Sequence, residues 1–433
     1  MDEKQMDQEQ SEQEQWKAVE PQQQPVKKKK VFGIGVITGI FGGCVLVAAL
    51  CLVLSGMGLL HVSVGKKTEA NNVLTASVEN KINSLVGEIN KYYYKDVKAD
   101  DLATGLYKGL FEGLKDPYSE YYTKKEYDDL MVTTKANYYG IGAGLKQDPD
   151  TMKVTITHIY DKSPAQEAGL KAGDVIVQVD DITATSMEVS DLVTKIRGEE
   201  GTTVHLKIFR EGDTDYRELD VKRAKVDIPT VQSKMLENNI GYIQVSEFAE
   251  NTPKEFDKAI QDLKGQGMQS MIIDLRDNGG GLVAACQAML DEILPQGTVV
   301  YTEDKYGNRK DYTSDAEHYM KLPIAVLVNG NSASASEIFA GAIRDFKYGT
   351  LIGTKTFGKG IVQNIIPLSD GGAFKVTIAK YFTPSGEYIH GKGIKPDIEL
   401  KYAYSGDANA TYDQMKDNQV LKAIETLKDK MQK

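Results

Sequence analysis

A long segment without any charged side chain constrains this chain more than any other feature. The segment extends from Val31 to Leu60 and is predominantly apolar. About 20 apolar residues in a helix, rising ~1.5 Å per residue, are enough to cross the ~30 Å hydrocarbon layer of a bilayer. A buried helix of a globular domain seldom runs this long without a charge. We therefore expect a transmembrane helix at residues 31–57.

The charges on either side of this segment predict its orientation. Residues 1–30 are rich in Gln and Glu, lack apolar periodicity and end in four consecutive lysines, whereas only Lys66 and Lys67 follow the segment closely. Because lysines collect on the cytoplasmic side, residues 1–30 are expected to form a disordered cytoplasmic tail. The long polar start and the lack of a clear cleavage site favour an uncleaved, single-pass anchor. The rest of the chain is then extracytoplasmic, at the cell membrane.

Composition excludes several other classes of protein. The formal net charge is -10 and no sustained basic patch follows residue 30, which argues against nucleic acid as a partner. The 3 cysteines are too few for a disulfide framework, and Cys286 has no cysteine or histidine near it in the sequence. We expect neither a metal nor a cofactor. A length of 433 residues allows two or three domains.

The first extracytoplasmic region, residues 68–135, has the pattern of helices. Its apolar residues recur mostly three or four positions apart. The aromatic-rich residues 116–122 interrupt this pattern, because Pro117 disfavours helix at the residue before it. We interpret residues 116–122 as a packing or self-association segment rather than as part of the chemistry.

Residues 138–212 change to short strands separated by glycines. A glycine-rich loop leads into a strand, and a short helix, a Gly-Asp turn and the strand 175–179 follow. No long helix follows the glycine loop, as a nucleotide-binding site would require. In this order the segment resembles a PDZ domain. A hairpin that is merely shaped by its glycines is the alternative.

The PDZ resemblance implies a binding mode and a set of residues. A partner's C-terminal peptide would add as a strand to a sheet edge, and loop amides would hold its terminal carboxylate. The residues that this likeness assigns to the loop are Gly140, Ile141, Gly142, Ala143 and Gly144.

Two strand–turn–helix units follow, at residues 269–294 and 323–346. They predict a mostly parallel sheet with its site at the carboxyl ends of the strands. Both units place small residues at a helix start, where free N–H groups can stabilise an oxyanion. The second unit offers Ser332, Ser334 and Ser336 as nucleophiles or helix caps, and spacing alone does not choose among them.

A nucleophilic serine needs a base. None of the 5 histidines lies in the pattern of a Ser–His–Asp triad. A lysine can serve if its pKa falls from ~10.4 toward ~7, which requires about 4–5 kcal/mol of bias against the charged form. Lys359, between two glycines and beside apolar residues, offers such a setting, and Lys355 is its rival. From these residues alone, an ordinary surface lysine remains the simpler interpretation of Lys359.

Taken together, residues 75–433 resemble the carboxyl-terminal processing, or tail-specific, protease family. Six motifs occur in the family's order: Asp-Pro-Tyr-Ser at 116–119, the PDZ-like segment at 138–212, Asp-Leu-Arg-Asp-Asn-Gly-Gly-Gly at 274–281, Ser-Ala-Ser-Ala-Ser-Glu at 332–337, Thr-Phe-Gly-Lys-Gly and a glutamine at 356–363, and Gly-Ile-Lys-Pro-Asp-Ile at 393–398.

This resemblance implies roles for particular residues. Ser334 would be the nucleophile, Lys359 the base, and Gln363 the residue that orients the lysine. The oxyanion would be held by the N–H groups of Ala335 and Gly280, with the next glycine, 281, as the alternative. Residues 276 and 277 are interpreted as structural.

The resemblance also implies a fold and a domain order. The fold class is α/β (α+β mixed), with a ClpP/crotonase-like core at residues 213–402, the PDZ domain at 138–212 inserted before it, and a helical region at 403–433. Regions 68–135 and 403–433 are candidates for homodimer contacts.

The function implied is that of a membrane-anchored serine endopeptidase. It would cleave extracytoplasmic proteins near their C-termini, and the PDZ domain would bind substrate tails and gate activity. Two rival interpretations are a catalytically silent PDZ scaffold and an acyl-CoA enzyme of the crotonase type. The second would need neither an anchor nor a PDZ module.

Overall fold

The computed structural model describes residues 73–315, 317–407 and 410–431. The predicted cytoplasmic tail and the transmembrane helix at 31–57 lie outside these ranges. Within them, no helix is both long and apolar enough to cross a bilayer. The chain divides into two compact units, Met1–Asp96 and Val97–Lys433.

The described part of the first unit is the helix α3 (Ala76–Tyr92). The Thr75 hydroxyl accepts the N–H of Val78 and so caps the start of the helix. None of the helix residues is buried, and Leu85 and Ile89 expose their apolar side chains. The predicted helix is confirmed here, with its apolar face uncovered.

The second unit begins with α4 (Ala99–Glu112), β1 (Glu120–Tyr122) and α5 (Lys124–Lys135). The predicted interruption between helices is confirmed, because the Asp116 carboxylate accepts the N–H of Tyr118 and the hydroxyl of Ser119 in a tight turn. β1 then adds to the edge of strand β18 (Ala373–Phe382). The aromatic segment therefore packs as part of a sheet, as predicted.

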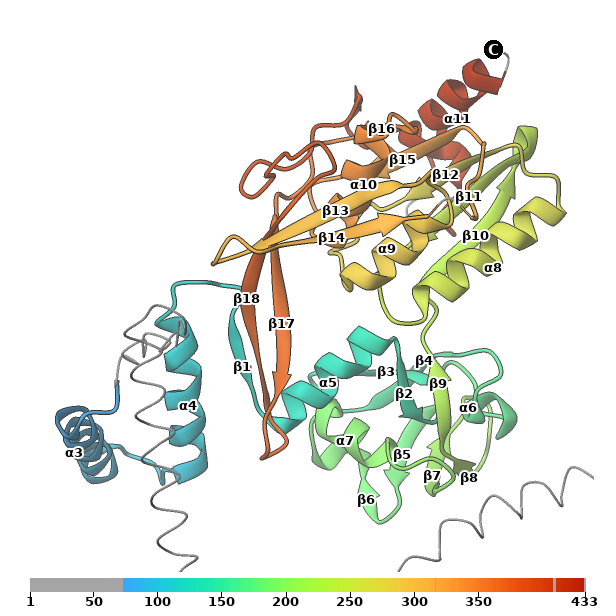
Figure 1. Cartoon of the computed structure of the whole chain (residues 1–433). Coiled ribbons are helices and arrows are strands. Elements are labelled where there is room, and N and C mark those ends of the chain that lie inside the picture. The colour runs from blue at the N-terminus through green and yellow to red at the C-terminus, as the bar shows by residue number, and fades with distance from the viewer. Residues whose placement is uncertain (1–72, 316, 408–409, 432–433) are drawn as a thin grey trace, which may run out of the picture. The chain divides into compact units, whose positions relative to one another are not determined.

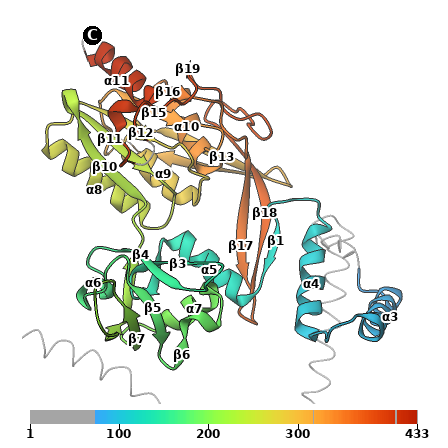
Figure 2. The same cartoon turned by 180° about the vertical axis from the view of Figure 1, so that it is seen from behind.

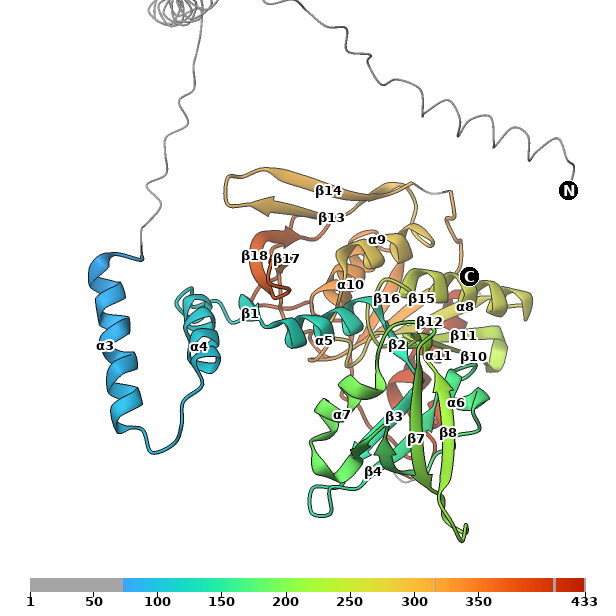
Figure 3. The same cartoon turned by 90° about the horizontal axis from the view of Figure 1, so that it is seen from below.

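The next module has a six-stranded sheet with the order β3-β4-β5-β7-β8, and β6 pairs with β5. Figure 3 shows its strands β3, β4, β7 and β8 with the helices α6 and α7. Its elements are β3 (Ala143–Gln147), β4 (Val154–Ile159), α6 (Pro164–Glu167), β5 (Val175–Val179), β6 (Ile182–Thr183), the 3₁₀ turn η1 (Ala184–Ser186), α7 (Val189–Ile196), β7 (Thr203–Phe209) and β8 (Arg217–Lys222). The predicted order of loop, helix, turn and strand is present. β8 lies beyond residue 212 but belongs to this sheet, so the module continues past the predicted boundary. Strands β2 (Asn137–Gly140) and β9 (Ala224–Asp227) pair with each other where the chain enters and leaves it.

The core of the unit is a six-stranded sheet with the order β10-β11-β12-β15-β16-β19. Its strands are β10 (Val231–Leu236), β11 (Ile240–Val245), β12 (Ser270–Asp274), β15 (Ile324–Val328), β16 (Gly349–Gly353) and β19 (Ile398–Glu399), and the short turn η2 (Glu237–Asn239) joins the first two. Only the pairing of β10 with β11 is antiparallel within this described sheet. All residues of β12 and β15 are buried, as in a sheet covered on both faces. The mostly parallel sheet predicted from the two strand–turn–helix units is confirmed.

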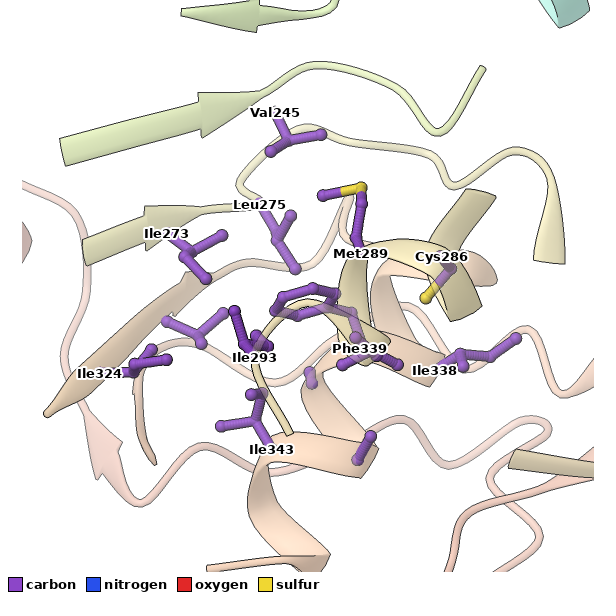
Figure 4. Close-up of a cluster of buried hydrophobic side chains, with 14 of the residues drawn as sticks. Val245, Ile273, Leu275, Cys286, Met289, Ile293, Ile324, Ile338, Phe339 and Ile343 are labelled. Atoms are coloured by element: carbon purple, nitrogen blue, oxygen red, sulfur yellow. The ribbon is translucent and has the colours of Figure 1, made fainter. Parts of the chain in front are cut away.

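Helices cover both faces of this sheet (Figures 1 and 2). One hydrophobic layer contains α8 (Thr252–Gly265), α9 (Val283–Asp291) and α10 (Ala335–Asp345). Phe339 of α10 lies among side chains of β12, β15 and α9 in this layer (Figure 4).

The other layer contains α11 (Asn418–Met431), which follows the short turn η3 (Gln414–Lys416). Val420, Ala423, Ile424 and Leu427 are buried against the sheet. The C-terminal helix is therefore part of the core. Its apolar face is not available for the dimer contact predicted for residues 403–433.

A second sheet has the order β1-β18-β13-β14, and β17 pairs with β18. The elements not yet bounded are β13 (Gly297–Asp304), β14 (Arg309–Ser314) and β17 (Ile361–Pro367). β17 begins two residues after Lys359, so this sheet fixes the segment that carries the predicted base.

Candidate active site

Ser334 occupies a strained turn between strand β15 and helix α10. It is the N-cap of the helix, with φ 55° and ψ -113°. A positive φ is unfavourable for a residue with a side chain and is typical of functional turns. The residue therefore lies where the free N–H groups and the positive end of the helix dipole meet.

Hydrogen bonds distinguish Ser334 from Ser332 and Ser336, which the spacing in the sequence did not. The hydroxyl of Ser332 donates to the carbonyl oxygen of Leu275 at 2.7 Å, and that of Ser336 donates to the carbonyl oxygen of Asn278 at 2.9 Å. Both residues are fully buried. Ser334 is the serine of this group that lines a cavity, and its role as the nucleophile, which the family resemblance implied, stays a prediction.

That cavity has a volume of about 260 Å³ and also contains Lys359. Its walls come from α5, the exit of β11, the glycine turn after β12, the start of α10, and strands β17 and β18. The fold thus brings the predicted nucleophile and the predicted base, 25 positions apart in the chain, into the lining of one cavity.

The environment of Lys359 lowers the pKa of its amine. Burial is the largest influence that lowers its pKa, and the charge of Lys375 lowers it further, while Asp116, Glu120 and Glu337 act in the opposite direction. The rival Lys355 is exposed and does not line the cavity.

The amine of Lys359 lies over the ring of Tyr118, 4.7 Å from its centroid. Within the described residues no hydrogen bond joins the amine to the Ser334 hydroxyl. Tyr118 belongs to the Asp-Pro-Tyr-Ser motif, for which the sequence predicted packing or self-association rather than a part in the chemistry. The motif was visible in the sequence, but its contact with the lysine depends on the pairing of β1 with β18.

Gln363 lies in β17 and lines the same cavity. Its side-chain amide donates to the hydroxyl of Thr377 on β18 at 3.2 Å. The residue is thus close to the base, but its amide is directed to the neighbouring strand. Its role in orienting the lysine stays a prediction.

The two predicted oxyanion donors differ in availability. The N–H of Ala335 begins helix α10 and has no acceptor among the residues that the structure describes. The N–H of Gly280 donates to the side-chain oxygen of Asn278 at 2.8 Å. Its use for an oxyanion would require that bond to break.

The alternative donor, Gly281, lines the cavity, and its N–H has no acceptor in the described part of the chain. Gly280 has φ 106°, and a Cβ there would lie 2.7 Å from the carbonyl oxygen of Ala333 and 2.7 Å from the Cβ of Ser334. The glycine turn therefore packs directly on the nucleophile's turn. Asn278, which sequence reasoning did not single out, holds this turn through a second bond to the carbonyl oxygen of Val245.

The five residues predicted for the PDZ loop form the link between β2 and β3. Gly140 ends β2, Ile141 is buried, Gly142 has φ 78°, and Ala143 and Gly144 begin β3. The N–H groups of residues 142 and 143 point to the hydroxyl of Tyr138, whose pKa is raised by burial to about 12.

Beside this loop lies a groove of about 360 Å³ between β3 and α7. Leu145, Val189 and Val193 give it apolar walls, and Arg197 and Asp129 lie at its edge and form an ion pair at 3.1 Å. An apolar groove next to converging amides suits a peptide terminus.

Comparisons with known proteins agree with these features. The model of peptidase family S41 matches residues 239–400, and a PDZ domain model matches residues 155–210. The carboxy-terminal processing protease CtpA of Bacillus subtilis is 35% identical over 376 residues, covering 87% of this chain and 78% of that protein. CtpB of the same organism is 33% identical over 325 residues, covering 74% of this chain and 67% of that protein. The solved structure of the photosystem II D1 C-terminal processing protease aligns over 76% of this chain and 87% of that one, with 28% identity and a TM-score of 0.43.

A serine at a strained helix start, facing a cavity with a half-buried lysine, is the arrangement expected of a serine-type peptidase, and the family match assigns the chain to that class. The relatives narrow the assignment, since their identity extends over most of both chains. The chain belongs to the carboxy-terminal processing proteases of peptidase family S41. The resemblance inferred from the six sequence motifs is thereby confirmed.

Proposed function

We propose that this protein is a membrane-anchored serine endopeptidase that cleaves extracytoplasmic proteins near their C-termini with a Ser334–Lys359 dyad. The observation that carries the proposal is the shared cavity of these two residues, in which burial lowers the pKa of the lysine. A neutral amine can accept a proton at a pH where an ordinary lysine cannot.

The chemistry follows from this placement. The Lys359 amine takes the proton of the Ser334 hydroxyl as its oxygen attacks the scissile carbonyl carbon. The N–H of Ala335 and one N–H of the glycine turn hold the resulting oxyanion. The ammonium then gives its proton to the departing amine, and water hydrolyses the acyl-enzyme with the same lysine as base.

Binding of a substrate tail in the PDZ groove is proposed to gate this chemistry. Helix α5 supports the idea, because one helix lines both places. Asp129 lies at the groove, and Leu130, Thr133 and Thr134 line the catalytic cavity. A peptide that displaces Arg197 from Asp129 would change the contacts of α5 at the groove and so act on the cavity.

Anchoring through residues 31–57 and self-association through the N-terminal helices complete the proposal. In α4, Leu106, Tyr107 and Leu110 are exposed, and none of the helix residues is buried. α3 shares this property. Exposed apolar faces on two helices are typical of surfaces that a second copy covers.

The test is cleavage of an unstructured protein with an apolar C-terminal tail by the full chain. Ser334→Ala and Lys359→Ala are expected to lower kcat at least ~10³-fold, because each removes one member of the dyad. The control Lys355→Ala changes an exposed lysine outside the cavity and should keep wild-type activity. Tail binding without cleavage by the wild type would support the rival scaffold, and hydrolysis retained in either dyad variant would refute the dyad.

A further inference from the structure

A buried carboxylate outside the predicted catalytic set connects the nucleophile's turn to the base's turn. Glu337 is the third residue of α10 and is 0% exposed. Its Oε2 accepts the N–H of Ser334 at 3.0 Å and the N–H of Lys359 at 2.8 Å. Its Oε1 accepts the N–H of Gly358 at 2.7 Å and the hydroxyl of Thr356 at 2.5 Å.

Helix capping alone does not account for this set of bonds. A glutamate at the third position of a helix commonly accepts the N–H of the N-cap residue, here Ser334. The other three donors come from residues 356–359, which lie on a different segment. One oxygen of Glu337 is therefore shared by the backbones of the two residues that must react together.

The strained conformation of Ser334 needs such support. Residues with unfavourable φ and ψ persist where surrounding contacts over-determine them. The peptide N–H of Ser334 is held by Glu337, and its carbonyl oxygen accepts the hydroxyl of the buried Tyr381 at 3.1 Å. Both peptide groups of the serine are thus fixed by buried side chains.

The bonds to Lys359 act only on its backbone. Its side-chain amine lies elsewhere, over Tyr118. Glu337 is therefore not placed to exchange a proton with the substrate or with the base. Its four donors offset the cost of burying a charged carboxylate and leave it little freedom to move.

We propose that Glu337 is a positioning residue that holds the Ser334 and Lys359 backbones at a fixed separation for attack. The proposal rests on the dyad described above and adds a residue that acts on the dyad through its backbone. The negative charge of Glu337 also raises the pKa of Lys359, so its loss would leave more neutral base and would not by itself lower the rate. A fall in rate would therefore report geometry, because a misplacement of about 1 Å at a reacting group can cost about 10²-fold.

Glu337→Gln is the most direct variant. Glutamine keeps the size of the side chain but has one acceptor oxygen and one NH₂ donor. That NH₂ group would face either the N–H of Gly358 and the hydroxyl of Thr356, or the N–H groups of Ser334 and Lys359. At least one N–H···O bond that now holds the two turns must therefore break. We expect kcat to fall about 10²-fold. We expect KM for a tailed substrate, and binding of a free tail peptide to the PDZ groove, to stay within twofold of the wild type.

A matched control is available in Glu255→Gln. Glu255 also lies in the first turn of a helix and accepts the N–H groups of Thr230 and Val231 at 2.7 and 3.1 Å. It does not line the catalytic cavity. Both Glu255→Gln and Glu337→Gln should lower Tm, but Glu255→Gln should leave kcat unchanged at temperatures well below Tm.

Tyr381→Phe keeps the experiment decisive if Glu337→Gln does not fold. It removes the hydroxyl that holds the Ser334 carbonyl and leaves the ring in the core. We expect a smaller fall in kcat, about tenfold, with unchanged tail binding. The rate at which a fluorophosphonate probe labels Ser334 should fall in parallel in both variants, since it reports the serine's geometry without a peptide substrate.

The outcomes separate this proposal from the proposed function. If Lys359→Ala is inactive but Glu337→Gln keeps the wild-type kcat and labelling rate, the positioning role is overturned and the dyad stands. Equal losses of kcat in Glu337→Gln and Glu255→Gln would also overturn it, because general destabilisation would then be the cause. Lys359→Ala fully active would refute the dyad itself. If Glu337→Gln does not fold, wild-type kcat in Tyr381→Phe would overturn the positioning of Ser334.

Discussion

The amine of Lys359 owes its lowered pKa first to burial and second to the positive charge of Lys375. Because burial and a neighbouring charge arise only in the folded chain, the sequence could not distinguish Lys359 from Lys355 without a family resemblance. The charge on β18 and the depth of the cavity arise only when segments far apart in the chain meet. The three serines could not be distinguished from the sequence for the same reason. The hydroxyls of Ser332 and Ser336 donate to carbonyl oxygens of residues 57 and 58 positions away.

A pH profile of kcat/KM tests whether the charge of Lys375 lowers the pKa of Lys359. In Lys375→Gln a positive charge is lost beside Lys359, so the ammonium form becomes less unfavourable and the pKa of Lys359 rises. Less neutral amine is then present near neutral pH. We expect the activity at pH 7 to fall and the ascending part of the profile to move to higher pH.

Lys380→Gln is the matched control, on the same strand but outside the cavity. Its profile should overlay that of the wild type. A profile for Lys375→Gln that stays in place, or that moves to lower pH, would show that this charge does not govern the base.

At the scale of elements, the sequence predicted those whose signals are local. The two strand–turn–helix units carry both their apolar strands and their turn residues within about 25 residues, and both occur in the structure. Strand β8 was not predicted from the sequence, because most of its residues are charged or exposed. The position of β1 could not be predicted, because its partner strand lies more than 250 positions further on.

The packing of α11 depends on a similar long-range contact. Arg276, at the end of β12, forms ion pairs with Asp274 and with Asp417 just before α11, at 2.5 and 2.7 Å, and its side chain is 10% exposed. These bonds support the structural role that the sequence analysis gave to Arg276.

Arg276→Met tests the stability that this network provides. Two buried carboxylates would lose their partner, so the free energy of unfolding should fall by about 3–5 kcal/mol in denaturant titrations. Lys258→Met breaks the exposed pair with Asp262 and should cost about 0–1 kcal/mol. Equal effects of the two substitutions would contradict the buried role of Arg276.

On the scale of the whole molecule, the order of the modules was predictable from the sequence, because each carries its own pattern of strands, helices and glycines. The contact of α5 with both the PDZ groove and the catalytic cavity was not predictable, because no local sequence pattern indicates which surfaces a helix contacts. The membrane anchor remains a prediction from hydropathy and charge alone.

The proposed gating predicts a dependence on the substrate's terminus. Amidation of the C-terminus removes the charge that the loop amides of Gly142 and Ala143 would bind after the tail displaces the Tyr138 hydroxyl to which they point. Because a hydrogen bond to a charged group contributes ~1.5–3 kcal/mol, KM should rise roughly tenfold or more. A short peptide that carries the cleavage site without the tail is the control, and amidation should leave its kinetics unchanged. Identical kinetics of the free and amidated tailed substrates would contradict recognition of the terminus by the PDZ module.

The measurement that tests the dyad most directly is the labelling rate of Ser334 by a fluorophosphonate probe as a function of pH, with the modified residue identified by mass spectrometry. The wild-type rate should rise with pH to a plateau, with its midpoint below the ordinary lysine pKa of ~10.4, because burial lowers the pKa of Lys359. Lys359→Ala should lose the rate and its pH dependence together. Labelling of Ser334 in Lys359→Ala at the wild-type rate, or labelling of a different residue, would contradict the account.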